Sequence, residues 1–284
     1  NQRVRFYLAT AETIGRVIVM EPPGEIPPKH RALVQIVLND PMVALAGDRF
    51  VIRDETNVRT LGGGVVLNPL GRRVRKPRDL YLDRLRAIGG PFGPAAVESM
   101  LTLQESLAMP PLRLAQLFNT PLAEIEAALK DARFIRLSLG DEEGFTTASK
   151  WEDLKRFTLD ALAIHHREEP LVAGLEMEAL RTRLPYDVAP RAFRALVDRL
   201  CKETGVVREG SLMRLGGHLV RLGGDDSKNG ARVEEILREA RFQPPDLTQL
   251  ADALKLPGAE HARLRTLLTV MEREVTLGQI AESD

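Results

Sequence analysis

The chain has 284 residues, of which 44% are hydrophobic and 28% charged, with 40 basic and 40 acidic side chains. It has room for about two or three domains, and it lacks both a signal-peptide pattern and the roughly 18-residue apolar run of a membrane span. A single cysteine, Cys201, excludes an internal disulfide or a CxxC metal site, so we expect a cytoplasmic protein, and the balanced charge creates no global field for nucleic acid.

From Arg3 to about Leu67, apolar and polar side chains alternate with the period of β-strands. Val4, Phe6 and Leu8 share one face, and aliphatic runs follow at residues 15–20, 31–38 and 48–53. Each run is bounded by proline, glycine, asparagine or aspartate, which form turns. About six short strands with no helix between them predict a closed antiparallel β-barrel, because closure removes the exposed edges of a sheet.

A glycine triplet, Gly62 to Gly64, lies near the end of this region. Backbone amides of a glycine-rich turn can bind phosphate, but the Lys and the Ser or Thr of a P-loop do not follow here. The triplet also continues into a strand, where a phosphate-binding loop would begin a helix. We therefore interpret it as a tight turn at which the backbone approaches a neighbouring strand, and we expect no GTP to bind it.

From about residue 80 onward the apolar period becomes that of helices. Two helices at 112–118 and 122–132 precede a strand at 134–139, a turn at 140–143 and a second strand at Phe145. Helix, helix and hairpin in this order predict a winged helix.

The same order recurs twice along the chain. The second copy predicts helices at 152–166, 177–184 and 190–205, followed by strand, turn and strand over 206–215. The third predicts helices at 233–242, 247–256 and 261–274, and the chain stops at Asp284 where a wing should close. We therefore expect a multidomain β + α protein with a barrel at 1–75, winged helices at 76–150 and 151–224, a flexible polar linker at 223–230, and a truncated winged helix at 230–284.

No cluster of residues in the sequence indicates a catalytic, cofactor or metal site. His165 and His166 lie near a helix end beside Glu168 and Glu169, and neighbouring positions on a helix point in different directions. We interpret them as a solvated helix end. Cys201 lies on an apolar helical stripe and is interpreted as a packing residue rather than a nucleophile.

Local clusters of basic residues are the remaining sequence feature that indicates a ligand, in this case a nucleic acid. Residues 72–86 hold seven basic side chains against two acidic ones, Asp79 and Asp83. Such a cluster neutralises phosphates and raises nucleic-acid affinity, although a solvated linker would have the same composition.

The winged helices differ in the charge of the surface that usually contacts nucleic acid. The second presents Arg191 and Arg194 on its third helix and Arg208 and Arg214 on its wing, whereas the first presents Glu124 and Glu126 and is interpreted as a spacer. Plain surface arginines remain the alternative. The candidate RNA-binding residues are Arg59, Arg72, Arg73, Arg75, Lys76, Arg191, Arg194, Arg208, Arg263 and Arg265.

Residues 3–20, 32–54 and 59–69 resemble the third domain of translational GTPases of the elongation factor Tu type, and above all the selenocysteine-specific elongation factors. The segment GDRFVIRD (47–54), followed by Arg59, Thr60 and a glycine-rich turn into VVL, carries the resemblance. Residues 242–257 also resemble the start of the third winged helix of that family. The resemblance covers nearly the whole chain.

The resemblance implies a function in translation. The family delivers selenocysteinyl-tRNA to the ribosome at UGA codons that an mRNA hairpin marks, and we expect this chain to be a monomer. The barrel would support contacts to tRNA and to the GTPase domain, with Arg59, Arg72 and Arg73 on the tRNA side, and the winged helices would extend toward mRNA. GTP and Mg would bind an N-terminal domain outside these residues, so no catalytic site is expected here, and the main hairpin contact would lie in a fourth winged helix.

Two other classes of protein fit the same pattern. A winged-helix DNA-binding regulator with an unrelated barrel as sensor would dimerise and bind duplex DNA through two basic recognition helices. A protein-interaction scaffold would use its winged helices to bind no nucleic acid at all.

Overall fold

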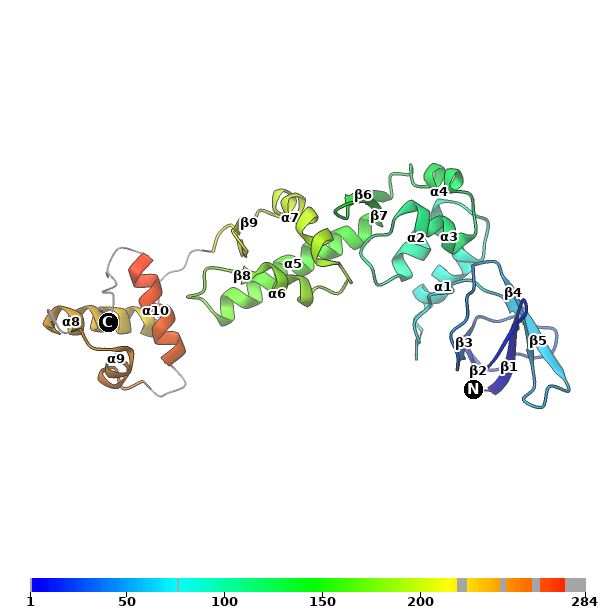
Figure 1. Ribbon diagram of the computed structural model, residues 1–284, viewed down its shortest axis with the longest axis horizontal. Helices are drawn as coiled ribbons and strands as arrows, with labels where there is room; N and C mark the ends of the chain where they lie inside the picture. The colour runs from blue at the N-terminus through cyan, green and yellow to red at the C-terminus, as the bar shows by residue number, and fades with distance from the viewer. Residues whose placement is uncertain (1, 76, 219–223, 241–243, 257–260, 274–284) are drawn as a thin grey trace. The chain divides into compact units, whose positions relative to one another are not determined.

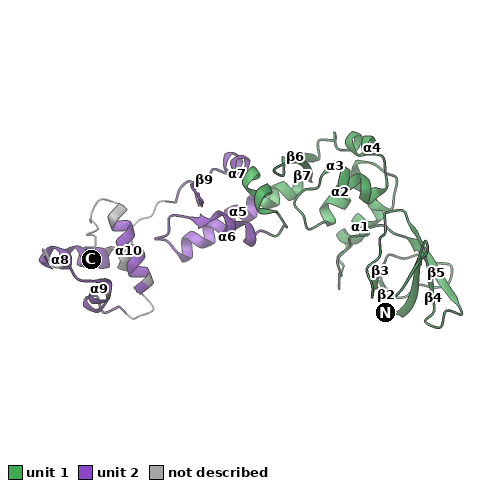
Figure 2. Cartoon of the chain, in the orientation of Figure 1, with its two compact units in different colours: residues 1–154, 185–197 green, residues 155–184, 198–284 purple. Residues whose placement is uncertain are grey.

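The computed structural model describes the chain except for residues 1, 76, 219–223, 241–243, 257–260 and 274–284 (Figure 1). The chain forms two compact units (Figure 2). Unit 1 contains residues 1–154 and 185–197, and unit 2 contains residues 155–184 and 198–284. Among the described residues, no helix is both long and apolar enough to cross a membrane.

The N-terminal part of unit 1 is a curled antiparallel sheet with strand order β3-β2-β1-β4-β5. Its apolar face follows the predicted alternation, since Val4, Phe6 and Leu8 are all buried and the Phe6 and Phe50 rings lie 5.1 Å apart. The strands are β1 (Gln2–Leu8), β2 (Ala11–Val19), β3 (Val34–Leu38), β4 (Arg49–Arg53) and β5 (Thr60–Val65).

We predicted a closed barrel of about six strands, but the barrel is not closed. The described sheet has five strands, and its edge strands β3 and β5 do not pair with each other, so the fold is a half-barrel. The physical reason is that helices cover apolar side chains that a sixth strand would cover in a closed barrel. Met20, Leu33 and Leu67 pack against the apolar core of the helices that follow, so they are buried without a sixth strand.

The glycine triplet lies within strand β5 and not in a turn, which corrects one part of its interpretation. The predicted close approach to a neighbouring strand is confirmed. A Cβ on Gly63 would lie 2.5 Å from the carbonyl oxygen of Phe50, and one on Gly64 would lie 2.6 Å from the Phe50 ring. Gly62, in contrast, faces open space.

The helical part of unit 1 has the predicted winged-helix order. The turn between α3 and α4 is tight because Asn119 adopts a left-handed conformation with φ of 50° and Pro121 begins the next helix. The elements are α1 (Asp79–Ile88), α2 (Pro94–Leu103), α3 (Pro111–Phe118), α4 (Leu122–Ala128), β6 (Phe134–Ser138) and β7 (Glu143–Thr147).

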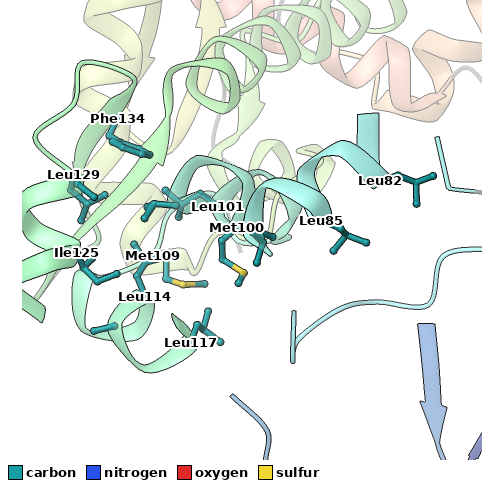
Figure 3. Close-up of a cluster of buried hydrophobic side chains, with 14 of the residues drawn as sticks. Leu82, Leu85, Met100, Leu101, Met109, Leu114, Leu117, Ile125, Leu129 and Phe134 are labelled. Carbon is teal, nitrogen blue, oxygen red and sulfur yellow. The ribbon is translucent and has the colours of Figure 1, made fainter. Parts of the chain in front are cut away.

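One apolar core joins these helices to the sheet. Leu85, Met100 and Leu114 lie in its centre (Figure 3), and Met20 from the end of β2 belongs to the same cluster. The Ala46 N–H also donates to the Leu117 carbonyl at 3.0 Å. The sheet and the first winged helix therefore share their interior.

The second winged helix also follows the predicted order. The apolar stripe of its third helix is buried at Phe193, Leu196, Val197 and Leu200, and Cys201 beside it is half-buried, which raises the pKa of its thiol. The two-residue strand β8 was too short to be predicted. The elements are α5 (Ala148–Glu168), β8 (Leu175–Glu176), α6 (Met177–Arg183), α7 (Pro190–Thr204), β9 (Val206–Glu209) and β10 (Leu212–Leu215).

The third helical group in unit 2 contains α8 (Gly224–Ala240), α9 (Leu247–Ala253) and α10 (His261–Arg273). The flexible linker predicted at 223–230 was wrong from Gly224 onward, because no proline interrupts the segment and it leads directly into the helix that buries Val233. A capping box between Asp246 and Gln249 begins α9. The expected third wing, after residue 273, lies outside the described residues.

The glycine contacts give a test of the half-barrel. Gly63→Ala should lower the free energy of unfolding by about 1–3 kcal/mol, because the new methyl group overlaps the Phe50 carbonyl. Gly62→Ala is the matched control and should change it by less than about 0.5 kcal/mol. Urea unfolding of unit 1 can be followed by fluorescence of Trp151, the single tryptophan. Equal effects of the two substitutions would contradict the assigned strand pairing.

Candidate nucleic-acid interface

The basic joint after the half-barrel is fastened to the sheet. The Gln35 side chain on β3 donates to the Arg72 carbonyl at 2.5 Å and accepts from the Val74 N–H at 3.1 Å. Val74 in turn packs against the shared apolar core. The joint is therefore an ordered part of unit 1 and not a freely solvated linker.

Carboxylates compensate part of the positive charge of this joint. Arg72 pairs with Glu105, and Arg84 lies 3.8 Å from Glu98. Arg86 pairs with Asp83 at 2.7 Å and with Glu21 at 2.5 Å. The Leu33 N–H and then Arg86 hold the pKa of Glu21 below its usual value, against the effect of desolvation.

Arg73, Arg75 and Arg78 are exposed and form no ion pair with any described residue. Lys76 lies outside the described residues. The free positive charge of the joint is thus concentrated at these three arginines.

Arg59 is placed at the start of β5 by a turn that Asp54 organises. The Asp54 carboxylate accepts from the Val58 and Arg59 backbone N–H groups at 2.8 and 3.2 Å, and the Asp54 N–H donates to the Arg59 carbonyl at 2.9 Å. Asn57 within the turn has a φ of 62°. The Arg59 side chain is exposed beside the glycine-rich edge strand.

The outer face of the sheet carries an arginine surface that we did not predict. Arg3 lies directly opposite Arg16 across β1 and β2, and Arg5 lies opposite Arg53 across β1 and β4. Arg49 points to the same face as Arg53, four residues earlier on β4. We call Arg3, Arg5, Arg16, Arg49 and Arg53 the sheet arginines. The signal was available, since these arginines occupy the outward positions of predicted strands.

Acidic groups balance only part of this surface. Arg3 pairs with Glu55 at 3.1 Å, and Arg5 pairs with Glu12. Arg53 donates to the Val58 carbonyl at 3.4 Å. Arg16 and Arg49 are exposed and form no ion pair within the described part of the chain.

The candidate arginines of the second winged helix are mostly engaged with their own chain. Arg191 pairs with Asp141 in the turn between β6 and β7, and Arg208 lies 3.7 Å from Asp198. Arg194 donates to the Pro190 carbonyl at 3.3 Å. Arg214 pairs with Glu209 at 2.5 Å.

The remaining candidates are exposed. Arg263 and Arg265 lie on the surface of α10, and Glu124 and Glu126 lie on the surface of α4 as predicted. Arg59, Arg73 and Arg75 thus lie in unit 1 with the sheet arginines. Carboxylates lie close to Arg72, Arg191 and Arg208, and Arg263 and Arg265 lie in unit 2.

Comparison with known proteins connects these parts to one family. The model described as "Selenocysteine-specific elongation factor, beta-barrel domain" matches residues 1–73, and the one described as "Elongation factor SelB, winged helix" matches residues 159–215. A selenocysteine-specific elongation factor from Desulfomicrobium baculatum is 25% identical over 268 residues, which are 93% of this chain and 42% of that protein. Both matched domains and this relative show that the chain is similar to the C-terminal part of selenocysteine-specific elongation factors.

A solved structure supports the fold. The crystal structure of the bacterial selenocysteine-specific elongation factor EF-Sec superposes with a TM-score of 0.53 at 13% identity, and the match covers 97% of this chain and 49% of that one. The chain thus spans less than half the length of the relatives that it matches. The family predicted from residues 3–20, 32–54 and 59–69 is confirmed.

The winged helix that the elongation-factor model matches contains the histidines, and their interpretation as a solvated helix end was wrong. His165 and His166 are only 5% and 9% exposed, because the end of α5 packs beside the end of β10. The His166 and His218 rings stack with centroids 3.6 Å apart. Among the described residues, no group of three or more His, Cys, Asp or Glu could hold a metal ion.

His166 acts as a hydrogen-bond acceptor in this cluster. Its Nε2 accepts the Leu215 N–H at 3.2 Å, which requires the neutral ring. Burial and the neighbouring His218, His165 and Arg214 lower the pKa of His166 to about 4. The cluster therefore closes the end of the second winged helix only while His166 is unprotonated.

This geometry predicts acid sensitivity. Because the folded-state pKa of His166 lies below its ordinary value of 6.5, its contribution to stability is present above pH 6.5 and is lost as the pH falls toward 4. The loss should reach about 3 kcal/mol of unfolding free energy. His166→Gln should remove that part of the pH dependence, whatever its effect at pH 7. Urea unfolding followed by circular dichroism at several pH values checks this, and an unchanged slope would contradict it.

Proposed function

We propose that this chain is the tRNA- and mRNA-facing part of a selenocysteine-specific elongation factor, and that the sheet arginines of unit 1 contact selenocysteinyl-tRNA. The similarity to selenocysteine-specific elongation factors supports the first statement. The second rests on one observation, the two cross-strand arginine pairs Arg3–Arg16 and Arg5–Arg53. In this proposal the delivered tRNA reads a UGA codon on the ribosome.

The cross-strand pairs indicate a ligand because they oppose folding. Like charges directly opposite each other on a sheet destabilise it, by an amount comparable to the roughly 0.2–1 kcal/mol that a favourable pair contributes. A polyanion that binds the same face removes this repulsion and releases its own counterions. RNA phosphates meet both conditions.

Arg59, Arg73, Arg75 and Arg78 extend the proposed surface within unit 1. Three of them follow the sheet in the ordered joint, and Arg59 precedes the edge strand β5. At Gly62 this edge exposes backbone with no neighbouring side chain within 4 Å, which lets another backbone approach closely. We propose that this edge and Arg59 contact the sugar-phosphate backbone.

The remaining functions of the family complete the proposal. The winged helices would extend toward an mRNA hairpin, with Arg263 and Arg265 on α10 as candidate contacts. GTP and Mg would bind a separate domain whose nucleotide state controls tRNA release. The fourfold domain division at 1–75, 76–150, 151–224 and 230–284 is part of this proposal, as are a monomeric state and a cytoplasmic location.

The ion pairs in the second winged helix argue against the DNA-binding regulator. A recognition helix that reads duplex DNA presents its first turns to the groove. Here Arg191 in the first turn of α7 pairs with Asp141, and Arg208 on the wing lies near Asp198. These carboxylates would have to be displaced before phosphates could bind.

The proposed surface can be tested by charge removal. Arg16→Gln combined with Arg49→Gln should weaken tRNA binding about tenfold or more and should lower the slope of log affinity against log salt by about 1 to 2, because up to two phosphate contacts are lost. Anisotropy titrations of labelled selenocysteinyl-tRNA at a series of salt concentrations measure both quantities.

The matched control removes the same charge elsewhere in unit 1. Arg113→Gln combined with Lys130→Gln changes two exposed residues of the first winged helix, near Glu124 and Glu126. This control should leave affinity and salt slope unchanged. Equal effects of the two double variants would exclude the sheet surface, and tighter binding of duplex DNA than of tRNA would exclude the proposed function.

A further inference from the structure

A buried lysine lies where the first winged helix meets the start of α5. The Lys150 side chain is only 4% exposed, and its Nζ donates to the Gln104 carbonyl at 2.7 Å and to the Ser106 carbonyl at 2.9 Å. No described carboxylate forms an ion pair with it. Burial lowers the pKa of Lys150 to about 8. An ammonium in such a place is costly unless the groups around it require it.

The other side of the ammonium faces an aromatic ring from a distant part of the sequence. Nζ lies 5.3 Å from the centroid of the Tyr186 ring, within the range of a cation–π interaction. The Tyr186 hydroxyl donates to Asp153 on α5 at 3.4 Å. Tyr186 belongs to unit 1, although it lies between helices α6 and α7 of the second winged helix.

The backbones on the two sides of Lys150 pair directly. The Leu107 N–H donates to the Asp187 carbonyl at 3.2 Å, and the Asp187 N–H donates to the Glu105 carbonyl at 3.0 Å. Ser106 and Asp187 form a parallel bridge. Lys150 therefore contacts both partners of this pairing: it donates to carbonyls of the 104–107 loop, and it faces the Tyr186 ring of the 185–188 segment.

An outer contact continues the same junction. Arg191 at the start of α7 pairs with Asp141, and its aliphatic stem covers Gly140, where a Cβ would lie 2.9 Å from the Arg191 Cγ. Gly140 has a φ of 103°, which favours glycine at this turn. This exposed pair contributes little by itself, so the junction depends mainly on the two backbone hydrogen bonds and on the buried lysine beside them.

We infer that Lys150 is a latch that fastens residues 185–197, including the first half of the recognition helix α7, onto the first winged helix. This half of α7 then unfolds locally together with the first winged helix, and its position depends on the buried ammonium of Lys150. A lysine suits the role because one long side chain can donate to two carbonyls and still face a ring. The latch is independent of RNA binding and of the proposed function.

Hydrogen exchange of the full chain tests the latch at the two pairing amides. In Lys150→Met, which keeps the aliphatic stem and removes the ammonium, the Leu107 and Asp187 amides should exchange about tenfold to a hundredfold faster. The Leu129 amide, which donates to the Ile125 carbonyl at 2.9 Å at the end of α4, should keep its protection. Lys130→Met, the same change at an exposed lysine, should alter none of the three amides.

Any other pattern of exchange in these variants would contradict the latch. Unchanged exchange at Leu107 and Asp187 would show that the ammonium does not hold the junction. An equal loss at Leu129 would show that Lys150 is a general core residue of the first winged helix. If Lys150→Met does not fold, Tyr186→Leu removes the ring and should give the same selective loss, and a uniform loss or no loss in that variant would overturn the inference.

Discussion

The apolar core that continues from the sheet into the first helices is the constraint on which unit 1 depends. The five-stranded curled sheet has unpaired edges, and its own apolar cluster around Phe6, Leu8 and Phe50 does not include Met20, Leu33 or Leu67. Met20, Leu33 and Leu67 are covered because helices α1 to α4 bring their apolar faces to them. This arrangement explains why the basic joint is ordered, because Val74 packs into the same core and Gln35 binds the backbone around it. The sheet and the first winged helix are two domains by sequence pattern but one folding unit by packing.

The shared core also determines which positive charges remain available. Side chains close to the core, such as Arg84 and Arg86, find carboxylates on neighbouring elements and are neutralised there. The outward positions of the strands have few such neighbours, because a sheet face presents its own cross-strand partners first. Where those partners are also arginines, as at Arg3 and Arg16, the charge is only partly compensated, since Arg3 pairs with Glu55 but Arg16 has no ion pair with a described residue. A neutral chain can therefore present a positive surface that its composition does not reveal.

Much of this fold could be predicted from sequence, because local periodicity carries it. The strand alternation at Val4, Phe6 and Leu8 and the order of α3, α4, β6 and β7 depend on short-range patterns, and both are confirmed. Closure of the barrel could not be predicted, since it depends on whether a strand or a helix covers Met20. The burial of His165 and His166 was missed for the same reason, because the end of β10 that covers them is about 50 residues away. Charge counts likewise showed seven basic residues in the joint but not the carboxylates that distant elements bring to Arg72 and Arg84.

The buried polar groups show where packing alone does not specify the structure. An apolar side chain in place of Lys150 or His166 would avoid a desolvation cost, but it would leave backbone groups near Gln104, Ser106 and Leu215 without these partners. Each of the two side chains binds backbone at a chain reversal or loop, where no helix or strand can satisfy those groups. Helices joined by short loops repeatedly create such places, because every junction brings irregular backbone against a packed face. In this chain Lys150 and His166 supply these partners, and they respond to pH in different ranges, because burial lowers the pKa of Lys150 to about 8 and that of His166 to about 4.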